Sequence, residues 1–379
     1  MTIVFTGGST GGHFYPLIAI SEALGDIVRE EHIVAPSLYF FAPSQFDEKA
    51  LFENGIIFIR VPAGRIRRYF SFANILSPFL VLLGVCRALV TLFRLYPDVV
   101  ISKGGFGSIP TVLAAWILCI PIIIHESDAK PGRANLFSAR FATKIAISFE
   151  SSRQFFRKKD QHKIARTGIP LRKALMRLER EGARQYLKLE DGVPTILILG
   201  GSLGATKINE AVLSALPDLL SFANIIHQTG QKNFAEVESL AKVILSKSEH
   251  ASRYHPFSYL DEVSLQRSAG VADLIISRAG ATAIAEIGLW KKPAILIPIP
   301  ESVSHDQRTN AYSYADTGAA IVLEEGNLTP HVLTSEAKRV LSDTELMARM
   351  STSAEGFTDI GAARLIAHEA LAIALSHES

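Results

Sequence analysis

A glycine-rich stretch near the start of the chain, Ile3–His13, constrains the fold more than any other segment. It combines a short apolar run, which predicts a buried strand, with glycines at positions 7, 8, 11 and 12 and a helical pattern over Phe14–Leu24. Glycine lets the backbone approach a ligand closely, and the free N–H groups of a helix N-terminus attract anions. The stretch therefore predicts an anion site with His13 at its end. A strand-to-helix turn with a packed histidine is the alternative.

The same pattern of strand, loop and helix repeats along the chain. Short β-branched runs end in glycine or polar residues and precede helical patterns, which is typical of parallel βαβ units. Strands are expected at Met1–Phe5, Ile33–Phe41, Ile56–Pro62, Asp98–Ser102, Pro121–His125, Lys144–Ser148, Thr195–Leu199, Ile225–Gln228, Arg253–Phe257, Leu274–Ser277, Ala294–Ile299 and Ala320–Leu323. Lys144–Ser148 is expected to close the first sheet, and the charged stretch Ser151–Lys163 to separate the two halves.

A second glycine loop, Gly200–Ala205, follows the strand that restarts the pattern. The chain has 379 residues and 48% hydrophobic content, which is enough to bury two cores. We therefore predict an α/β protein of two doubly wound parallel-sheet domains that face each other across a cleft. Ligands bind beyond the carboxyl ends of the strands in such sheets, and both glycine loops fall there.

Composition narrows the class of protein. The net charge of +2 argues against a general nucleic-acid binder. Cys86 and Cys119 lie in apolar runs, which predicts buried, reduced thiols in a cytosolic protein. The chain enters a strand directly, without the basic region of a signal peptide.

The first glycine loop fails the common nucleotide fingerprints. Ser9 stands where a dinucleotide-binding loop needs its second glycine, and His13 follows Gly12 where a P-loop needs lysine. The sequence has no Asp-x-Asp and no clustered Cys/His spacing, so a metal site has no support.

Three further segments join a strand to polar or glycine residues. Lys103–Ser108 precedes a helical pattern, which predicts either a substrate contact or a loop that needs glycine for its geometry. His125–Ala129 ends an apolar strand with titratable side chains. Ser277–Glu286 leads into a helix in which Glu286 either compensates the helix dipole or accepts hydrogen bonds from sugar hydroxyls.

These segments resemble one known family. The motifs that carry the resemblance are Thr6–His13, Lys103–Phe106, His125–Asp128, Gly200–Ala205, Ser277–Ala281 and Gln307–Ala311. In this order and spacing they are similar to the MurG family, the bacterial N-acetylglucosaminyltransferases that convert lipid I to lipid II in peptidoglycan synthesis. The resemblance covers about residues 2 to 325.

The resemblance implies a GT-B fold and a division of labour between the domains. Residues 1–163, with a C-terminal helix at about 356–379 packing back, would bind the lipid acceptor, and residues 164–355 would bind UDP-GlcNAc. Donor contacts are implied for Thr10, Gly11, Gly12, Asp128, Arg172, Ser202, Leu260, Ala281, Thr282, Ala283, Glu286, Gln307 and Asn310, and acceptor contacts for Gly104, Gly105, Phe106 and His125.

Among the donor residues, the resemblance gives some specific roles. Ser202 and its loop would hold the diphosphate, Glu286 the ribose hydroxyls, and Gln307 and Asn310 the sugar hydroxyls. Leu260 and Ala281–Ala285 would line the uracil and ribose pocket, and Arg172 would approach the nucleotide.

Three residues depart from the family pattern. Ser9 replaces a usual glycine, Asp128 an asparagine found in many members, and Ala283 a threonine whose hydroxyl Thr282 could supply.

The implied chemistry is an inverting sugar transfer that needs no metal and no cofactor beyond the donor substrate. A base must take the proton of the acceptor hydroxyl, and dipoles must stabilise the departing diphosphate. His13 is the first candidate for the base, because neutral histidine titrates near working pH. Glu126, oriented by His125, is the second. The His13 ring could instead bond the diphosphate or order the loop.

Other activities remain open at this stage. The same scaffold serves transferases with another lipid or small acceptor, nucleotide-sugar 2-epimerases, and a nucleotide-sugar binding protein without activity.

One apolar segment concerns the membrane. Tyr69–Cys86 is uncharged, but Ser77 and Pro78 are among the residues that interrupt it, so a membrane span is not expected. Arg65, Arg67 and Arg68 precede it, and basic residues beside an apolar helix predict docking on an anionic membrane surface. A buried helix with a solvated basic loop is the alternative. The resemblance implies a peripheral protein on the cytoplasmic face of the bacterial inner membrane, with cell-wall synthesis proteins as further partners.

Overall fold

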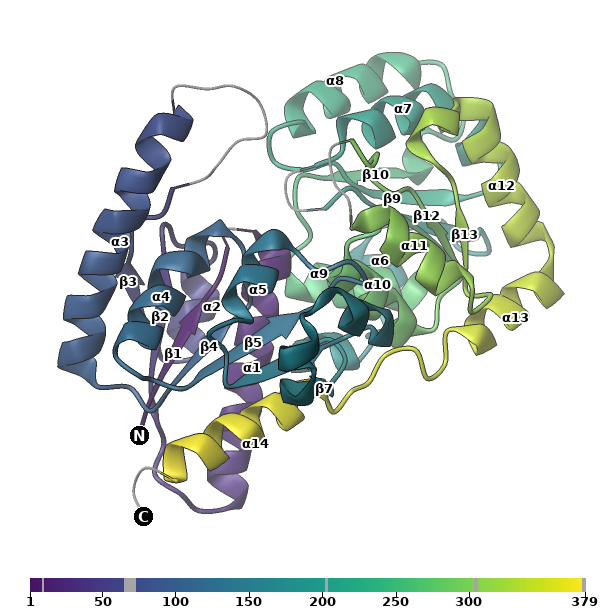
Figure 1. Cartoon of the computed structure of the whole chain (residues 1–379). Coiled ribbons are helices and arrows are strands. Elements are labelled where there is room, and N and C mark those ends of the chain that lie inside the picture. The colour runs from purple at the N-terminus through teal and green to yellow at the C-terminus, as the bar shows by residue number, and fades with distance from the viewer. Residues whose placement is uncertain (9, 65–72, 202–203, 303–305, 377–379) are drawn as a thin grey trace. The chain divides into compact units, whose positions relative to one another are not determined.

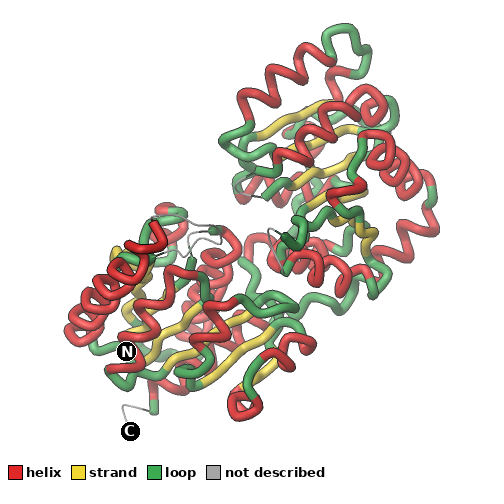
Figure 2. The backbone as a smooth tube through the Cα atoms, turned by 45° about the horizontal axis from the view of Figure 1, so that its top comes forward, coloured by secondary structure: helices red, strands yellow, loops and turns green. Residues whose placement is uncertain are grey.

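The structure is a computed structural model, and it describes residues 1–8, 10–64, 73–201, 204–302 and 306–376. The chain divides into two compact units, each built on a parallel sheet (Figures 1 and 2). The N-terminal unit comprises Met1–Arg172 and Asp359–Ser379, and the C-terminal unit comprises Lys173–Thr358. Two doubly wound α/β units were predicted, and this is confirmed.

The N-terminal sheet has the strand order β3-β2-β1-β4-β5-β6-β7. Its strands are β1 Thr2–Thr6, β2 Ser37–Ala42, β3 Ile56–Arg60, β4 Val99–Ser102, β5 Ile122–Glu126, β6 Lys144–Ile147 and β7 Ile164–Arg166. Its helices are α1 Gly11–Glu30, α2 Glu48–Glu53, α3 Ala73–Leu95, α4 Ile109–Ile117, α5 Arg133–Ser138 and α14 Ala362–Leu375.

Strand β7 corrects two expectations about this sheet. β7 follows the charged stretch Ser151–Lys163 in the sequence and pairs with β6. The strand predicted at Lys144–Ser148 is therefore not the last of the sheet. The N-terminal unit consequently extends to Arg172, past the boundary expected at residue 163.

Alternation along the strands places two apolar layers on the sheet. Ile3 and Phe5 of β1 pack into a cluster that includes residues of α1 and α14, whereas Val4 packs with residues of α3 and α4. The last helix thus belongs to the N-terminal unit, where Ile366 is buried and Arg364 forms an ion pair with Glu30. Helices therefore cover both faces of the sheet, as in a doubly wound fold.

The C-terminal sheet has the order β10-β9-β8-β11-β12-β13. Its strands are β8 Thr195–Leu199, β9 Asn224–Gln228, β10 Tyr254–Phe257, β11 Leu274–Ser277, β12 Ala294–Leu296 and β13 Ala320–Val322. Its helices are α6 Ala183–Tyr186, α7 Thr206–Leu220, α8 Phe234–Ile244, α9 Glu262–Val271, α10 Ala281–Trp290, α11 Gln307–Ala315, α12 Pro330–Ser342 and α13 Thr344–Ser353.

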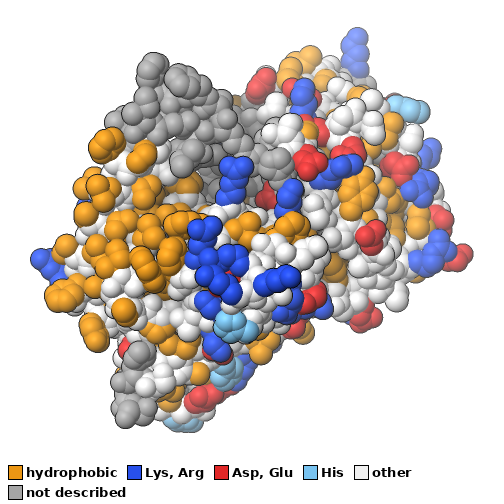
Figure 3. Space-filling model, in the orientation of Figure 1, with side chains coloured by type: hydrophobic (Ala, Val, Ile, Leu, Met, Phe, Trp, Pro, Cys, Tyr) orange, Lys and Arg blue, Asp and Glu red, His pale blue; other side chains and the backbone are white. Residues whose placement is uncertain are grey.

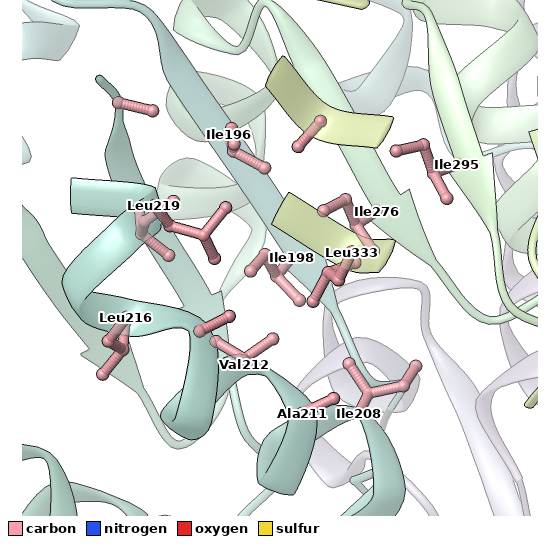
Figure 4. Packing of buried hydrophobic residues seen from close by; sticks show 14 of the residues in the cluster. Ile196, Ile198, Ile208, Ala211, Val212, Leu216, Leu219, Ile276, Ile295 and Leu333 are labelled. Carbon is pink, nitrogen blue, oxygen red and sulfur yellow. The ribbon is translucent and has the colours of Figure 1, made fainter. Parts of the chain in front are cut away.

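The core of this unit also lies on both sides of its sheet. Ile196 and Ile198 of β8 point toward Val212 and Leu216 of α7 (Figure 4). Leu197, between them on the strand, packs instead in the cluster that contains α10. Each prediction of a strand in this half is correct in position, with ends that differ by a few residues.

The prediction of two buried thiols is wrong. Cys86 and Cys119 are free and exposed. Cys86 lies on α3, and Cys119 follows α4 in a left-handed conformation. An apolar run is buried only where another element covers it, and one face of α3 and the C-terminal end of α4 are uncovered.

Helix α3 presents a broad exposed apolar face. Its buried stripe includes Ala88 and Leu92. Large exposed side chains on it are Phe79, Leu80, Leu82, Leu83, Val90 and Phe93. Figure 3 shows hydrophobic side chains gathered over this helix. Among the described residues, α3 alone has the length and composition of a membrane span, with a mean hydropathy of 1.9 over Ser77–Leu95 and 17% of that window buried.

Candidate active site

Three neighbouring strands of the N-terminal sheet end in the segments singled out from the sequence. β1, β4 and β5 are adjacent, and they lead into Gly7–Thr10, Lys103–Gly105 and Ser127–Asp128. Ser9 lies outside the described residues. The carboxyl edge of a parallel sheet gathers segments that are distant in sequence. Glycine loops and titratable side chains consequently meet at one edge of this unit.

Helix α1 begins earlier than the sequence predicted. It starts at Gly11, so Gly11, Gly12 and His13 form its first turn, with exposed Thr10 at the N-cap position. The amides of His13 and Phe14 donate to the Thr10 carbonyl oxygen over 3.0 Å each. His13 is therefore fixed on a helix rather than carried by a loop.

The His13 ring lies between two glycines from different strands. A Cβ atom placed on Gly8 would be 2.6 Å from its Cδ2, and one placed on Gly105 would be 2.7 Å from the same atom. No side chain fits at either position without displacing the ring. The glycine loops that follow β1 and β4 thus close around His13, which explains part of their glycine content.

Burial sets the ionisation of His13. Burial first, and then the positive charge of Lys103, lower the pKa of the imidazole from 6.5 to about 3. The ring is therefore neutral at pH 7, as a general base must be.

Glu126 is committed to the loop that follows β5. Its Oε1 accepts a hydrogen bond from the Asp128 amide at 2.9 Å, and its Oε2 accepts from the Gly132 amide at 2.9 Å and from Asn135 Nδ2 at 3.0 Å. The side chain is buried. These contacts make Glu126 a group that shapes the loop, and they do not favour it as the base.

His125 is buried on the same strand. Its Nε2 is 2.9 Å from the carbonyl oxygen of Gly168, to which a neutral ring donates. Burial lowers the pKa of His125 to about 3, and Lys103 contributes in the same direction. The ring therefore ties the segment after β7 to β5, and it is not hydrogen-bonded to the Glu126 carboxylate among the described contacts.

Gly104 and Gly105 both have positive φ angles, and Phe106 opens a short 3-10 turn that leads into α4. Gly104 is buried, whereas Gly105, Phe106 and Asp128 are partly exposed. All four residues follow β4 or β5, so the acceptor and donor contacts that the resemblance implies for them lie at the same sheet edge as His13.

Arg172, the last residue of the first segment of this unit, stacks on α1. Its Cζ lies 4.0 Å from the centroid of the Tyr15 ring, and the Tyr15 hydroxyl donates to Asp47 at 3.1 Å. Only 9% of Arg172 is exposed. Stacking fixes the plane of a guanidinium, so α1 orients Arg172 as well as His13.

The C-terminal unit has a corresponding edge. The strands β8, β9 and β11 are adjacent and lead into Gly200–Gly201, Thr229–Gly230 and Arg278–Gly280. Ser202 lies outside the described residues. Gly204 is packed so closely that a Cβ atom there would be 2.5 Å from the Thr229 carbonyl oxygen. The second glycine loop is thus seated directly on the segment that follows β9.

The other implied donor residues are distributed around this edge. Ala281 is buried, and Thr282, Ala283 and Glu286 are partly exposed on α10. Leu260 is buried, and its amide donates to Gln228 Oε1 at 3.1 Å.

Two donor residues on α11 also hold backbone segments. Gln307 Oε1 accepts from the Ile299 amide at 3.2 Å. Buried Asn310 donates through Nδ2 to the Ala279 carbonyl at 3.4 Å. Both side chains therefore fix the segments that follow β12 and β11.

A buried polar network between α7 and β9 was not predicted from the sequence. His227 lies between the Tyr254 hydroxyl, 3.0 Å from Nδ1, and Asn209 Oδ1, 3.1 Å from Nε2. Asn209 Nδ2 donates to the Thr229 carbonyl at 3.0 Å. Burial lowers the pKa of His227 to about 3, so this ring is neutral. The network joins the start of α7 to β9.

Lys103 is the other residue that sequence analysis left without a role. It is 2% exposed, and its Nζ donates to Ser127 Oγ at 2.8 Å. Its position inside the Lys103–Phe106 motif was the available signal.

Within residues 1–8, 10–64, 73–201, 204–302 and 306–376, no group of three or more His, Cys, Asp or Glu side chains could hold a metal ion.

Comparison with known proteins identifies the family. Residues 3–147 match the Glycosyltransferase family 28 N-terminal domain, and residues 195–364 match the corresponding C-terminal domain. A Bacillus cereus protein named UDP-N-acetylglucosamine–N-acetylmuramyl-(pentapeptide) pyrophosphoryl-undecaprenol N-acetylglucosamine transferase 2 is 37% identical over 346 residues, which is 91% of this chain and 92% of the relative. The chain belongs to this family of N-acetylglucosamine transferases. A transferase of the same name, without the number, from Halothermothrix orenii is 37% identical over 94% of each chain.

Solved structures agree with the transferase fold. The crystal structure of Acinetobacter baumannii MurG has a TM-score of 0.70 and 25% identity, covering 98% of this chain and 100% of that one. A UDP-GlcNAc 2-epimerase from Neisseria meningitidis has a TM-score of 0.69 but 15% identity, covering 98% and 100%. The epimerase likeness shows the fold alone, whereas the sequence relatives identify this chain as a transferase.

Proposed function

We propose that this transferase moves GlcNAc from UDP-GlcNAc to the 4-hydroxyl of MurNAc in undecaprenyl-pyrophosphoryl-MurNAc-peptide, lipid I, and thereby forms lipid II of peptidoglycan. The observation that carries the proposal is identity of 37% along nearly the whole length of relatives that bear this activity in their names. The two loop-lined sheet edges supply a place for each substrate.

The donor belongs at the edge of the C-terminal unit. Gly200 and Gly201, together with the N-terminus of α7, offer backbone N–H groups to the departing diphosphate. Glu286 accepts hydrogen bonds from the ribose, and Gln307 and Asn310 contact the sugar hydroxyls. Backbone dipoles can stabilise the leaving group in this arrangement without a metal ion.

The acceptor belongs at the edge that holds His13. The neutral imidazole takes the proton of the MurNAc hydroxyl as that oxygen attacks the anomeric carbon, and the bond to UDP breaks on the opposite face. The sugar configuration is therefore inverted. Glu126 keeps the loop after β5 in place while this happens.

An incubation without acceptor separates the transferase from a 2-epimerase. With UDP-GlcNAc alone, we expect neither UDP nor the 2-epimer of the donor by NMR. With lipid I added, UDP should appear. Epimer formation, or equal UDP release with diacylglycerol in place of lipid I, would contradict the proposal.

We also propose that the transferase docks on the cytoplasmic surface of the inner membrane through α3. The exposed apolar side chains Phe79, Leu82 and Phe93 support this proposal, being 69%, 62% and 72% exposed. Arg87 and Arg94 are exposed on the same helix, and basic side chains favour anionic lipid. The cluster Arg65, Arg67 and Arg68 lies outside the described residues.

Replacing Phe79, Leu82 and Phe93 together by serine should reduce cosedimentation with anionic vesicles by about tenfold or more, because each apolar side chain removed from the interface costs on the order of 1–2 kcal/mol. Serine at Arg65, Arg67 and Arg68 should weaken binding to anionic but not to neutral vesicles. The matched control is Val243→Ser on α8, where the side chain is 71% exposed in the other unit. Unchanged cosedimentation of the variant at Phe79, Leu82 and Phe93 would exclude α3 as the docking surface.

A further inference from the structure

Lys103 is a buried lysine at the sheet edge where we place the anionic acceptor. Lysine is seldom buried, because removing its charge from water is costly unless other groups stabilise it. Lys103 stands at the carboxyl end of β4, 2% exposed, and its Nζ is held by Ser127 Oγ at 2.8 Å. Ser127 follows directly on β5, so this contact joins the ends of two adjacent strands.

Two carboxylates, those of Glu126 and Asp128, act on the positive charge of Lys103. Burial lowers the pKa of Lys103, while the carboxylates of Glu126 and Asp128 act in the opposite direction and favour the ammonium. Both carboxylates flank Ser127 in sequence, and Glu126 is itself buried. Asp128 adds a negative charge where many family members carry a neutral asparagine. This edge would repel a diphosphate unless a cation balanced it.

We propose that Lys103 is a positioning residue for the acceptor: its ammonium, fixed by Ser127, neutralises the carboxylates of Glu126 and Asp128, and so lets the diphosphate of lipid I bind beside His13. The inference rests on the acceptor site proposed above. It implies that Asp128 is tolerated here because Lys103 is present.

A double-variant cycle tests this charge balance. Lys103→Met keeps the length of the side chain and removes its charge, and it should raise the KM for lipid I by about tenfold or more. The KM for UDP-GlcNAc should change much less, and this distinguishes the lipid diphosphate from that of the donor. In an Asp128→Asn background, the effect of Lys103→Met on the KM for lipid I should shrink by about threefold or more, since one of the two carboxylates to be balanced is gone and that of Glu126 remains.

Two controls keep the test decisive. Lys144→Met removes a lysine of the same sheet whose side chain is 49% exposed, so it lowers the net charge by the same amount as Lys103→Met. Because Lys144 is not next to the carboxylates of Glu126 and Asp128, this variant should leave the KM for lipid I unchanged. Lys103→Arg, which retains the charge, should restore much of the acceptor binding. All variants are compared at a temperature where circular dichroism shows them folded.

Equal effects of Lys103→Met in the two backgrounds, or a rise confined to the KM for UDP-GlcNAc, would overturn the role of Lys103. If turnover also survived the loss of His13, the acceptor site itself would be wrong. If His13→Ala abolished turnover, but Lys103→Met had the same effect with and without Asp128→Asn, only the role proposed for Lys103 would be rejected.

Discussion

Replacing His13 by alanine is expected to lower turnover by about 10²–10⁴-fold, the usual contribution of a general base, while UDP binding stays intact. The ring is held on the first turn of α1 between Gly8 and Gly105, and the donor loop belongs to the other unit. Turnover is measured as UDP release under single-turnover conditions, and UDP affinity by calorimetry.

Two variants sharpen this test. His13→Gln can still donate a hydrogen bond to a diphosphate but cannot serve as a base of similar strength, so it should not restore the rate. His162→Ala, at an exposed histidine of the same unit, should leave the rate unchanged. A near wild-type rate in His13→Ala, with UDP binding preserved, would remove His13 from the mechanism.

The pH profile follows from the pKa of His13. In the free enzyme the pKa is about 3, so protonation does not remove the base until the pH falls toward 3, and kcat/KM should show no loss near pH 6.5 from this group. A base with so low a pKa accepts a proton poorly. Binding of an anionic diphosphate nearby raises the pKa of a histidine, so the acid limb of kcat should lie at higher pH than that of kcat/KM.

Glu126→Gln should destabilise the N-terminal unit by roughly 2–3 kcal/mol, because an amide can replace only part of a carboxylate that accepts three hydrogen bonds. In either orientation its NH₂ group faces an N–H donor. Hydrogen exchange of the segment after β5, followed by mass spectrometry, should become faster over residues 127–135, and turnover should fall with it.

The matched control is Glu150→Gln. That carboxylate pairs with Arg153 on the surface, where ion pairs contribute about 0–1 kcal/mol. A Glu126→Gln variant with normal exchange and stability but no turnover would contradict the structural role and restore Glu126 as the candidate base.

The strands were predictable because a parallel sheet covered on both faces needs continuous β-branched runs, and such runs are visible in sequence. β7 was missed because it is a three-residue strand, Ile-Ala-Arg, that follows a charged stretch. The start of α1 was predicted too late because glycine is a poor helix former. In the structure, Gly11 and Gly12 nevertheless occupy the first turn of α1, next to His13. The position of the His13 ring depends on the close approach of Gly8 and Gly105.

The site was predictable where chemistry follows directly on a strand. His13, His125 and Glu126 were proposed as candidates in this way, because they lie close to the carboxyl ends of β1 and β5. Which of them is a neutral ring and which a carboxylate occupied by loop amides depends on burial and hydrogen bonds. Lys103 was noted only as part of a motif, and His227 only within a predicted strand, because a polar residue in an apolar strand or glycine motif gives no sign of its partners. Their contacts with Ser127 and Asn209 are tertiary.

The most direct test of the account is transfer to lipid I in a purified system. UDP-GlcNAc, lipid I and this transferase should yield UDP in an amount equal to lipid I consumed, and a lipid product whose mass contains both MurNAc-peptide and one added GlcNAc, joined in the inverted configuration. Release of UDP at the same rate without lipid I, or a product that lacks the second sugar, would contradict it.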